Sequence, residues 1–248
     1  MPQPEPPLEP RIVCTLPTFN EAGNIVPLCR ELIALGDHVE VLVVDDASPD
    51  GTARLVEELS AEEPRVHLLL RTSDPGRGRS GRDGFVQALE RGAEVVVEMD
   101  ADFSHQPKYV PAMVAALREG GHGLVLGSRG VSGGQDADRG LFRRALTVVA
   151  NAYIRIVLGV RVRDCNSGFR VWDAETLRRI RVEETFSKGP AIVQELLFKT
   201  ARAGISISEH PIQFVNRNEG ESTLALRKLL AGYVTVLKLR WMALRGVL

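Results

Sequence analysis

The sequence predicts an α/β fold with a mostly parallel central sheet that is flanked by helices and followed by an amphipathic helical tail. Over the first half of the chain, continuous apolar runs rich in β-branched residues alternate with segments of helical periodicity. This alternation is typical of a parallel sheet whose two faces are both covered by helices. A second observation agrees with it. Acidic residues follow three of the apolar runs, at the edge where open α/β sheets bind their ligands.

The elements of the first half follow from these runs in order. Strands are expected at residues 11–16, 39–44, 66–70, 94–99 and 124–127. Helices are expected at 24–35, from the turn at 48–51 to about residue 59, at 83–91 and at 108–118. Together they predict the nucleotide-binding type of architecture.

Between the third strand and the helix at 83–91 lies a stretch rich in glycine and arginine, residues 76–81. It reads formally as G-x-G-x-x-G, the dinucleotide-binding fingerprint. That fingerprint belongs to a first strand-to-helix turn of small residues, whereas this stretch follows the third strand and contains Arg77 and Arg79. We therefore interpret it as a flexible loop near a diphosphate and not as a Rossmann cofactor site.

The second half has less regular periodicity. Residues 130–140 are rich in Gly, Asp and Ser and are expected to form a mobile loop. The remaining elements are expected as a long helix at 141–158, a turn and short strand at 164–172, a helix at 191–203, and a strand pair or one long edge strand at 205–215.

Residues 222–248 carry five basic residues and no acid, together with a broad apolar face. The basic residues are Arg227, Lys228, Lys238, Arg240 and Arg245. A basic amphipathic helix with Trp241 at its interface can lie on an anionic membrane surface. The sequence favours this modestly, because a solvated face rarely lacks acids. A terminal helix docked on the domain, or a dimer helix, is the alternative.

Composition bounds the class of protein. The formal net charge of −1 provides no basic excess to bind a phosphate backbone, which argues against a nucleic-acid partner. The three cysteines are widely spaced and are expected to be reduced thiols of a cytoplasmic protein. Residues 1–10 contain five prolines and are expected to form a disordered tail and not a signal peptide. No segment has the roughly 18 apolar residues that a membrane-spanning helix needs.

The chemistry is concentrated where the fourth strand ends, at Asp100 and Asp102. Two carboxylates with one residue between them suit Mg²⁺ or Mn²⁺, whose coordination is completed by substrate phosphate and water. Asp-x-Asp also occurs by chance, and the alternative is a pair of turn and helix-capping acids. Acids also follow the first and second strands, in residues 17–21 and 45–46. In a parallel sheet these acids meet at one edge and repel one another unless a cation or a ligand lies among them.

Arg129 ends the fifth strand and therefore lies over the same edge, where a guanidinium suits phosphate oxygens. His105 and the other histidines have no metal-ligand spacing and are treated as ordinary residues. No nucleophile with a partner base is evident, which disfavours a hydrolase.

Several stretches, in order along the chain, resemble those of family 2 glycosyltransferases and, within that family, of the dolichol-phosphate (polyprenyl-phosphate) mannosyltransferases. They are residues 16–21 (LPTFNE), 43–52 (VVDDASPDGT), 99–107 (MDADFSHQP), 127–129 (GSR), 164–170 (DCNSGFR), 187–189 (SKG) and 214–222. The first two are specific to the superfamily, and the SKG and GES stretches indicate the polyprenyl-phosphate branch. The resemblance implies a GT-A type single domain at residues 11–221, with a nucleotide-sugar-binding half at 11–129 and an acceptor half at 130–221. The basic amphipathic helix at 222–248 follows it.

The resemblance also implies roles for single residues. The nucleoside would be held by Pro17, Phe19, Glu21, Val44 and Asp46. The diphosphate would meet Asp100, Ala101 and Asp102, and the ion would be held by Asp100, Asp102 and Ser104. Phosphates of donor or acceptor would be bound by Arg129 and Arg217, the acceptor phosphate by Arg143 and Thr147, and a further phosphate by Lys188. Asp102 and Arg129 are expected to carry catalysis.

Three departures from the family pattern bear on the identity of the sugar, the nucleotide and the acceptor more than on the fold. Phe19 stands where Tyr is usual, so a hydroxyl is lost while the stacking face remains. Thr223 stands where Lys is common, which removes a positive charge from the donor site. Residues 76–84 are more arginine-rich than the usual Gly-Leu-Gly-Thr-Ala.

The resemblance implies an inverting, metal-dependent transfer of a sugar, most simply mannose from GDP-mannose, to a polyprenyl phosphate, and the residues suit the chemistry of such a transfer. A lipid phosphate is already anionic at neutral pH, so its attack needs no strong base. The enzyme must supply in-line positioning and neutralise the leaving nucleoside diphosphate. We expect a cytoplasmic protein, peripheral on the cytoplasmic membrane face, that reaches its lipid through residues 222–248 or a membrane-protein partner. The alternatives are a glycosyltransferase with a soluble or short prenyl-phosphate acceptor and a nucleotide-sugar-binding protein without turnover.

Overall fold

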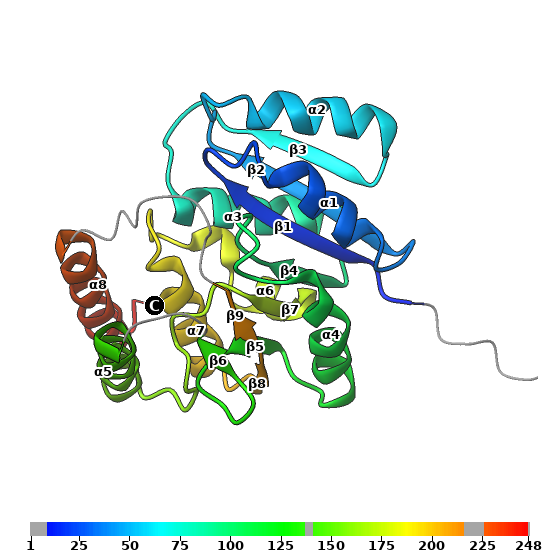
Figure 1. Ribbon diagram of the computed structural model, residues 1–248. Helices are drawn as coiled ribbons and strands as arrows, with labels where there is room; N and C mark the ends of the chain where they lie inside the picture. Colours follow the sequence, from blue (N-terminus) through cyan, green and yellow to red (C-terminus); the bar gives the residue numbers. More distant parts are fainter. Residues whose placement is uncertain (1–8, 137–140, 216–225, 248) are drawn as a thin grey trace, which may run out of the picture.

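The computed structural model describes residues 9–136, 141–215 and 226–247, which form an α/β fold around a seven-stranded sheet (Figure 1). The strands of this sheet are β1 (Ile12–Thr18), β2 (Val39–Asp45), β3 (Val66–Leu70), β4 (Val95–Glu98), β5 (Leu124–Ser128), β7 (Arg170–Asp173) and β8 (Ile207–Pro211). Their order is β3-β2-β1-β4-β7-β5-β8, and every strand except β7 runs in the same direction. The predicted α/β fold with a mostly parallel sheet is confirmed.

Helices cover both faces of the sheet. One face is covered by α1 (Ile25–Ile33), α2 (Thr52–Glu62), the 3₁₀ turn η1 (Pro107–Tyr109) and α4 (Val110–Glu119). The other face is covered by α3 (Arg77–Glu90), α6 (Ala174–Arg179), the 3₁₀ turn η2 (Val182–Glu184) and α7 (Ile192–Arg202). Two further helices, α5 (Leu141–Leu158) and α8 (Leu226–Leu244), pack against each other at the α7 side of the molecule (Figure 1).

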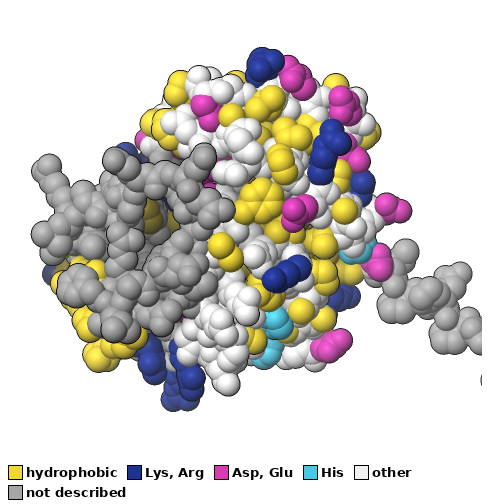
Figure 2. Space-filling view, viewed as in Figure 1, with side chains coloured by type: hydrophobic (Ala, Val, Ile, Leu, Met, Phe, Trp, Pro, Cys, Tyr) yellow, Lys and Arg dark blue, Asp and Glu magenta, His cyan; other side chains and the backbone are white. Residues whose placement is uncertain are grey.

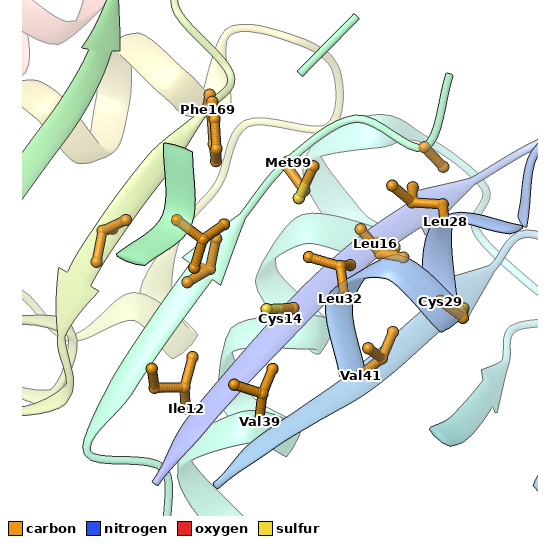
Figure 3. Packing of buried hydrophobic residues seen from close by; sticks show 14 of the residues in the cluster. Ile12, Cys14, Leu16, Leu28, Cys29, Leu32, Val39, Val41, Met99 and Phe169 are labelled. Carbon is orange, nitrogen blue, oxygen red and sulfur yellow. The ribbon is translucent and has the colours of Figure 1, made fainter. Parts of the chain in front are cut away.

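The alternation of side chains along β1 divides the core into two clusters. Cys14 and Leu16 point toward Leu28 and Leu32 of α1, as Figure 3 shows. Val13 points to the opposite face and belongs to the cluster that α3 and α7 cover. Because both faces are buried, the strand reads as one continuous apolar run.

The interpretation of residues 76–81 as a flexible loop is wrong, because α3 already begins at Arg77. The glycines there serve close packing. A Cβ atom at Gly78 would overlap the carbonyl oxygen of Ser187 and lie 2.7 Å from that of Gly189. The N–H of Gly78 donates to the carbonyl oxygen of Lys188 at 3.0 Å. Glycine therefore lets the first turn of a helix lie directly against the segment 187–189.

Within residues 130–140, which are expected to form a mobile loop, the structure has a short strand, β6 (Gln135–Asp136), which pairs in parallel with β9 (Gln213–Phe214). The strand pair expected at 205–215 corresponds to β8 and β9, which lie in different sheets. Residues 137–140, the Pro-rich segment 1–8 and residues 216–225, with Arg217 and Thr223, lie outside the described residues.

The expected C-terminal helix exists as α8, and it docks on the domain. Val236 and Leu239 are buried against α5 and α7, and the rings of Tyr153 and Tyr233 meet edge to face at 5.0 Å. Lys238 lies over the ring of Phe186 at 4.8 Å. Among the described residues, no helix is both long enough and apolar enough to cross a bilayer.

Candidate active site

The strand order reverses between β1 and β4, which makes their carboxyl ends a topological switch point, where open α/β sheets bind ligands. On one side of β1, Pro17 lies opposite Val44 of β2. On the other side, Thr15 lies opposite Glu98 of β4. The loops after these three strands therefore leave the sheet next to one another. We call this edge the rim, and it comprises residues 19–24, 45–51 and 99–105.

The loop after β1 presents an aromatic ring and is tied to the loop after β2. Phe19 is 59% exposed, which is high for a phenylalanine and leaves a face on which a flat ring can stack. The N–H of Glu21 donates to Thr52 Oγ1 and the N–H of Ala22 to Asp50 Oδ2, both at 3.0 Å. Phe19 and Glu21 thus lie at the rim, next to Pro17 near the end of β1.

The two adjacent acids at the carboxyl end of β2 have different roles. Asp45 is fully buried and accepts hydrogen bonds from Ser48 N at 2.8 Å and Thr18 Oγ1 at 2.9 Å, so it holds the strand ends together. Asp46 accepts the N–H of Gly76 at 2.8 Å and forms an ion pair with Arg71. Asp46 therefore fixes the start of α3 at the rim.

The turn after β4 holds the two spaced carboxylates. Asp102 Oδ1 accepts the N–H of Ser104 at 3.0 Å, and Phe103 adopts a left-handed φ of 58°, which makes the turn tight. Ala101 is 2% exposed and belongs to the hydrophobic core cluster that α1 and α4 cover.

The turn fits a divalent cation, provided that a diphosphate completes the coordination. In the part of the chain that the structure describes, no group of three or more His, Cys, Asp or Glu side chains could hold a metal ion. Ser104, however, is buried and its Oγ has no hydrogen-bond partner among the described residues. This hydroxyl lies in the same turn as Asp100 and Asp102, which gives three hard oxygen donors. Mg²⁺ and Mn²⁺ take such donors together with substrate phosphates and water.

Arg77, the first residue of α3, neutralises acids at the rim. Its Nη2 lies 3.0 Å from Glu98 Oε1 and 3.4 Å from Asp100 Oδ1. Burial lowers the pKa of Arg77, but the charges of Glu98 and Asp100 outweigh burial and raise that pKa above its ordinary value. Glu98 is fully buried, so Arg77 supplies this carboxylate with a partner of opposite charge inside the fold.

His105 links the Asp100 turn to the second half of the chain. Its Nδ1 accepts the N–H of Asp100 at 3.0 Å. Its ring stacks on Phe169 at 5.2 Å and meets Phe214 edge-on at 5.6 Å. Burial lowers the pKa of His105, which holds the ring neutral with the proton on Nε2. Treating it as an ordinary residue missed this contact with a predicted metal ligand.

Arg129 is held by a buried carboxylate. Its Nε and Nη2 donate to the two oxygens of Asp164 at 2.7 and 2.9 Å, and its guanidinium lies 5.0 Å from the ring centre of Phe214. Burial raises the pKa of Asp164, but the hydrogen bonds and charge of Arg129 outweigh burial and hold it below its usual range. The predicted catalytic arginine is therefore fixed in one orientation beside the aromatic ring that contacts His105.

A cavity of about 630 Å³ opens beside Arg129, between the end of β5 and α5. We call it the arginine cavity, because Arg129, Arg155 and Arg163 line it together with one acid, Asp164. Thr147, predicted to bind the acceptor phosphate, also lines it. A cavity with this excess of positive charge suits an anionic ligand.

Three other predicted site residues either lie outside the arginine cavity or have side chains that are not among the described ones. Lys188 is exposed, 3.9 Å from Asp74, and its segment packs against the start of α3, so it lies on the Arg77 side of the site. Arg143 lies in the first turn of α5, but its side chain is outside the described residues, as is the whole of Arg217.

Sequence reasoning missed five charged or titratable residues of the site. They are Arg77, His105, Arg155, Arg163 and Asp164. His105 and Asp164 lie within stretches that carry the family resemblance, so the sequence contained a signal that could have identified them as site residues. Arg77 was hidden by the interpretation of its segment as a loop. Nothing in the sequence singles out Arg155 or Arg163, because they join the site through tertiary packing.

The sequence and the fold both resemble those of known proteins. The family described as glycosyl transferase family 2 matches residues 14–186. The undecaprenyl-phosphate mannosyltransferase of Micrococcus luteus is 40% identical over 240 residues, covering 95% of this chain and 98% of that protein. The polyprenol monophosphomannose synthase of Mycolicibacterium smegmatis is 38% identical over 216 residues, covering 87% of this chain and 81% of that protein.

A solved structure also matches the fold. Glucosyl-3-phosphoglycerate synthase from Mycobacterium tuberculosis, crystallised with Mn²⁺, uridine diphosphate and glucosyl-3-phosphoglycerate, superposes with a TM-score of 0.68. The match covers 96% of this chain and 81% of that one at 22% sequence identity, so it shows the fold alone.

Proposed function

The chain belongs to glycosyl transferase family 2, and from this premise we propose that it transfers a mannosyl residue to a polyprenyl phosphate. Membership of the family makes it a glycosyltransferase. The acceptor is inferred from the names of the Micrococcus and Mycolicibacterium relatives, which cover most of the chain. One observation carries the proposal. A carboxylate turn at the rim and an arginine-lined cavity lie on either side of the contacts that join His105, Phe214 and Arg129.

The rim suits a nucleoside diphosphate sugar, and GDP-mannose is the donor that we propose. Phe19 offers a stacking face for the base, and Glu21 and Asp46 offer acceptors for its N–H groups or for the ribose hydroxyls. Pro17 and Val44 form the adjacent wall. Lys188 approaches the diphosphate from the segment against α3.

Asp100, Asp102 and Ser104 are the residues that we propose to hold a Mg²⁺ or Mn²⁺ ion. The glucosyl-3-phosphoglycerate synthase with the same fold was crystallised with Mn²⁺ and a nucleoside diphosphate, which supports a divalent ion here. When bound, the ion supplies Lewis-acid stabilisation of the charge that develops on the leaving diphosphate. Arg77 beside Asp100 adds a fixed positive charge near the same place.

The arginine cavity is the proposed site of the acceptor phosphate. Arg129 is already oriented by Asp164, so it binds the phosphate without a further loss of side-chain freedom. Thr147 adds a hydroxyl donor from α5. The phosphate is anionic at neutral pH and attacks the anomeric carbon with inversion, so no protein side chain needs to remove a proton. This agrees with the neutral, buried state of His105.

A lipid acceptor and a nucleotide donor together indicate where the reaction takes place. We propose that the enzyme works on the cytoplasmic face of a membrane as a peripheral protein, because the donor is soluble and the acceptor is held in the bilayer. Residues 217 and 143, whose side chains the structure does not describe, remain proposed phosphate ligands.

The proposal is tested by incubating the protein with radiolabelled GDP-mannose and a short, water-soluble prenyl phosphate, with Mn²⁺ or with a chelator. We expect label in a prenyl phosphate mannose, lost on chelation, and a rate at least tenfold lower with UDP-glucose as donor. Label that stays in GDP-mannose or appears as free mannose, whichever metal is added, would contradict the proposed transfer.

A further inference from the structure

Two oppositely charged side chains, Arg77 of α3 and Glu98 of β4, meet next to the carboxylate turn of the rim. Arg77 Nη2 lies 3.0 Å from Glu98 Oε1 and 3.4 Å from Asp100 Oδ1, so one guanidinium contacts both a core carboxylate and a proposed metal ligand. The side chain of Glu98 is 1% exposed, whereas that of Arg77 is 23% exposed. The pair therefore extends from the core of the fold to the rim.

This pair differs from the charge pairs on the surface. Figure 2 shows Lys and Arg side chains interspersed with Asp and Glu side chains over α1 and α2, at the top of the molecule. In one such pair, Arg30 with Glu62 at 3.5 Å, both side chains are largely exposed, and pairs of this kind contribute little. A buried carboxylate interacts more strongly with a nearby cation, and removing that cation leaves an uncompensated charge. Glu98 therefore holds Arg77 more firmly than a surface acid would.

A second buried guanidinium keeps Glu98 in place. Arg170 of β7 lies directly opposite Glu98 in the β4–β7 pair and is fully buried. Its guanidinium donates to the carbonyl oxygens of Val193 at 2.7 Å and Ser167 at 2.9 Å, which fixes its position. Burial lowers the pKa of Arg170 to about 10, and the charge of Glu98 opposes this shift, so Arg170 stays charged at neutral pH. Glu98 is thus placed between one cation in the core and another, Arg77, at the rim.

Glycine at position 81 gives the guanidinium of Arg77 the room that it needs. A Cβ atom at Gly81 would lie 3.0 Å from Arg77 Nη1 and 3.9 Å from Glu98 Oε1. The buried Nη1 of Arg77 has no hydrogen-bond partner among the described residues. The guanidinium therefore has hydrogen-bonding capacity that Glu98 and Asp100 do not use, and a phosphate oxygen is the kind of acceptor that suits it.

A cation at this position has opposite effects on the two components of the donor complex. Arg77 shares Asp100 with a divalent ion and repels that ion, so it lowers the affinity of the rim for the ion alone. Arg77 attracts the diphosphate of a nucleotide, so it raises the affinity for the donor. The negative charge of the diphosphate compensates both cations when ion and nucleotide are bound together.

We propose that Arg77 makes the rim selective for the complex of ion and diphosphate over the ion alone, and that Glu98 is the residue that positions Arg77 for this task. This rests on the proposed function, because it requires a divalent ion at Asp100, Asp102 and Ser104 and a nucleoside diphosphate beside them. Arg77 is then a specificity-determining residue of the donor site.

Two affinities of the full-length protein test the proposal. One is the affinity for Mn²⁺ alone, measured from the electron paramagnetic resonance signal of free Mn²⁺, and the other is the affinity for GDP at saturating Mn²⁺, measured by calorimetry. For the double variant Arg77→Met with Glu98→Gln, we expect Mn²⁺ alone to bind about tenfold more tightly and GDP about tenfold more weakly. Replacing both charges avoids the unpaired buried carboxylate that Arg77→Met alone would leave.

Glu98→Gln alone should act in the opposite direction. Arg77 then keeps its charge while Glu98 no longer offsets it, so Mn²⁺ alone should bind about fivefold more weakly. Arg77→Lys keeps the charge as well, and its affinity for Mn²⁺ alone should stay within about threefold of that of the unsubstituted protein. General damage to the rim would weaken Mn²⁺ binding in every variant, so opposite signs identify the role of the charge pair.

Arg30→Met with Glu62→Gln is the matched control, because it removes the same two charges from an exposed pair on α1 and α2. Both affinities of this control should stay within about twofold of those of the unsubstituted protein. Three results would overturn the inference: an unchanged or weaker Mn²⁺ affinity in the Arg77 and Glu98 double variant, shifts of the same sign in that variant and in Glu98→Gln, or an equal shift in the control.

Transfer of mannose to the water-soluble prenyl phosphate separates this inference from the proposed function. Transfer by the unsubstituted protein, together with variant affinities that do not change, contradicts the inference alone. The expected shifts in a protein that transfers no mannose support the inference and contradict the proposed transfer. Failure of the unsubstituted protein to bind Mn²⁺, with or without GDP, contradicts both the proposed metal site and the selectivity assigned to Arg77.

Discussion

The rim and the arginine cavity are built in opposite ways. The rim is a row of acids at the ends of β1, β2 and β4, and two of them are engaged by arginines of α3 and its preceding loop, Asp46 by Arg71 and Asp100 by Arg77. The arginine cavity has the opposite balance of charge, because its described lining residues include three arginines and the single acid Asp164. This difference supports the proposal that one edge of the sheet serves two anionic substrates. The rim suits a diphosphate that arrives with a cation, and the cavity suits a phosphate that arrives without one.

The largest effect is expected at the rim. Asp102→Ala should reduce turnover at least about 100-fold, a loss of about 2.7 kcal/mol of transition-state stabilisation, because a carboxylate ligand of the proposed ion is removed. The measurement is the rate of mannosyl transfer with Mn²⁺, and Asp37→Ala, a fully exposed acid, is the control. Near-normal activity of the Asp102 variant with the metal chelated would show that the rim does not work through an ion.

A smaller effect is expected on stability at the arginine cavity. Asp164→Asn should lower the free energy of unfolding by about 2 kcal/mol at pH 7, because Arg129 loses its charged partner in a nearly buried place. The pKa of Asp164 is held below its usual value of about 4, so this stabilisation is present above that pH and is lost as the pH falls through the folded-state pKa.

Urea unfolding at a series of pH values from 7 downward measures this contribution of Asp164 to the free energy of unfolding. The difference between the unsubstituted protein and Asp164→Asn should shrink below about pH 4. Asp37→Asn is the control and should show no such pH-dependent difference. A difference that stays constant down to pH 2 would mean that the charge of Asp164 does not stabilise the cavity.

The smallest effect concerns how α3 is held at the rim. Gly78→Ala adds a methyl group that overlaps the carbonyl oxygens of Ser187 and Gly189, which costs about 2 kcal/mol, while alanine favours the helix by about 1 kcal/mol. We expect a net loss of about 1 kcal/mol in the free energy of unfolding. Gly189→Ala is the control, since its Cβ meets nothing within 4 Å. Equal stability of the two variants would contradict the tight contact of α3 with residues 187–189.

The two regions also differ in how far the sequence predicts them. The rim is local. Pro17 and Val44 lie near the ends of strands that are evident as apolar runs, and Asp46 directly follows the second of these strands. Parallel pairing then sets them side by side. The fold and the acidic turn at Asp100 and Asp102 were therefore within reach of the sequence.

The arginine cavity depends on contacts between distant segments. Arg129 meets Asp164 across 35 residues, and Arg155 of α5 and Arg163 line the same cavity only through tertiary packing. Helical periodicity predicts that α5 forms but not which residues its exposed side carries to the site. The prediction of a flexible loop at residues 76–81 was wrong for a related reason. Their glycines suggested a loop, whereas the partner that requires glycine, the segment 187–189, lies about 110 positions later in the chain.

Separate Michaelis constants for donor and acceptor test the division between the two regions most directly. Arg129→Lys removes the two-point hold of Asp164 while keeping a positive charge. We predict that it raises the KM for prenyl phosphate at least about tenfold and leaves the KM for GDP-mannose within about twofold, and that Asp102→Asn does the reverse. Variants that both raise the same KM, or that both leave the two constants unchanged, would contradict a donor rim and an acceptor cavity as distinct sites.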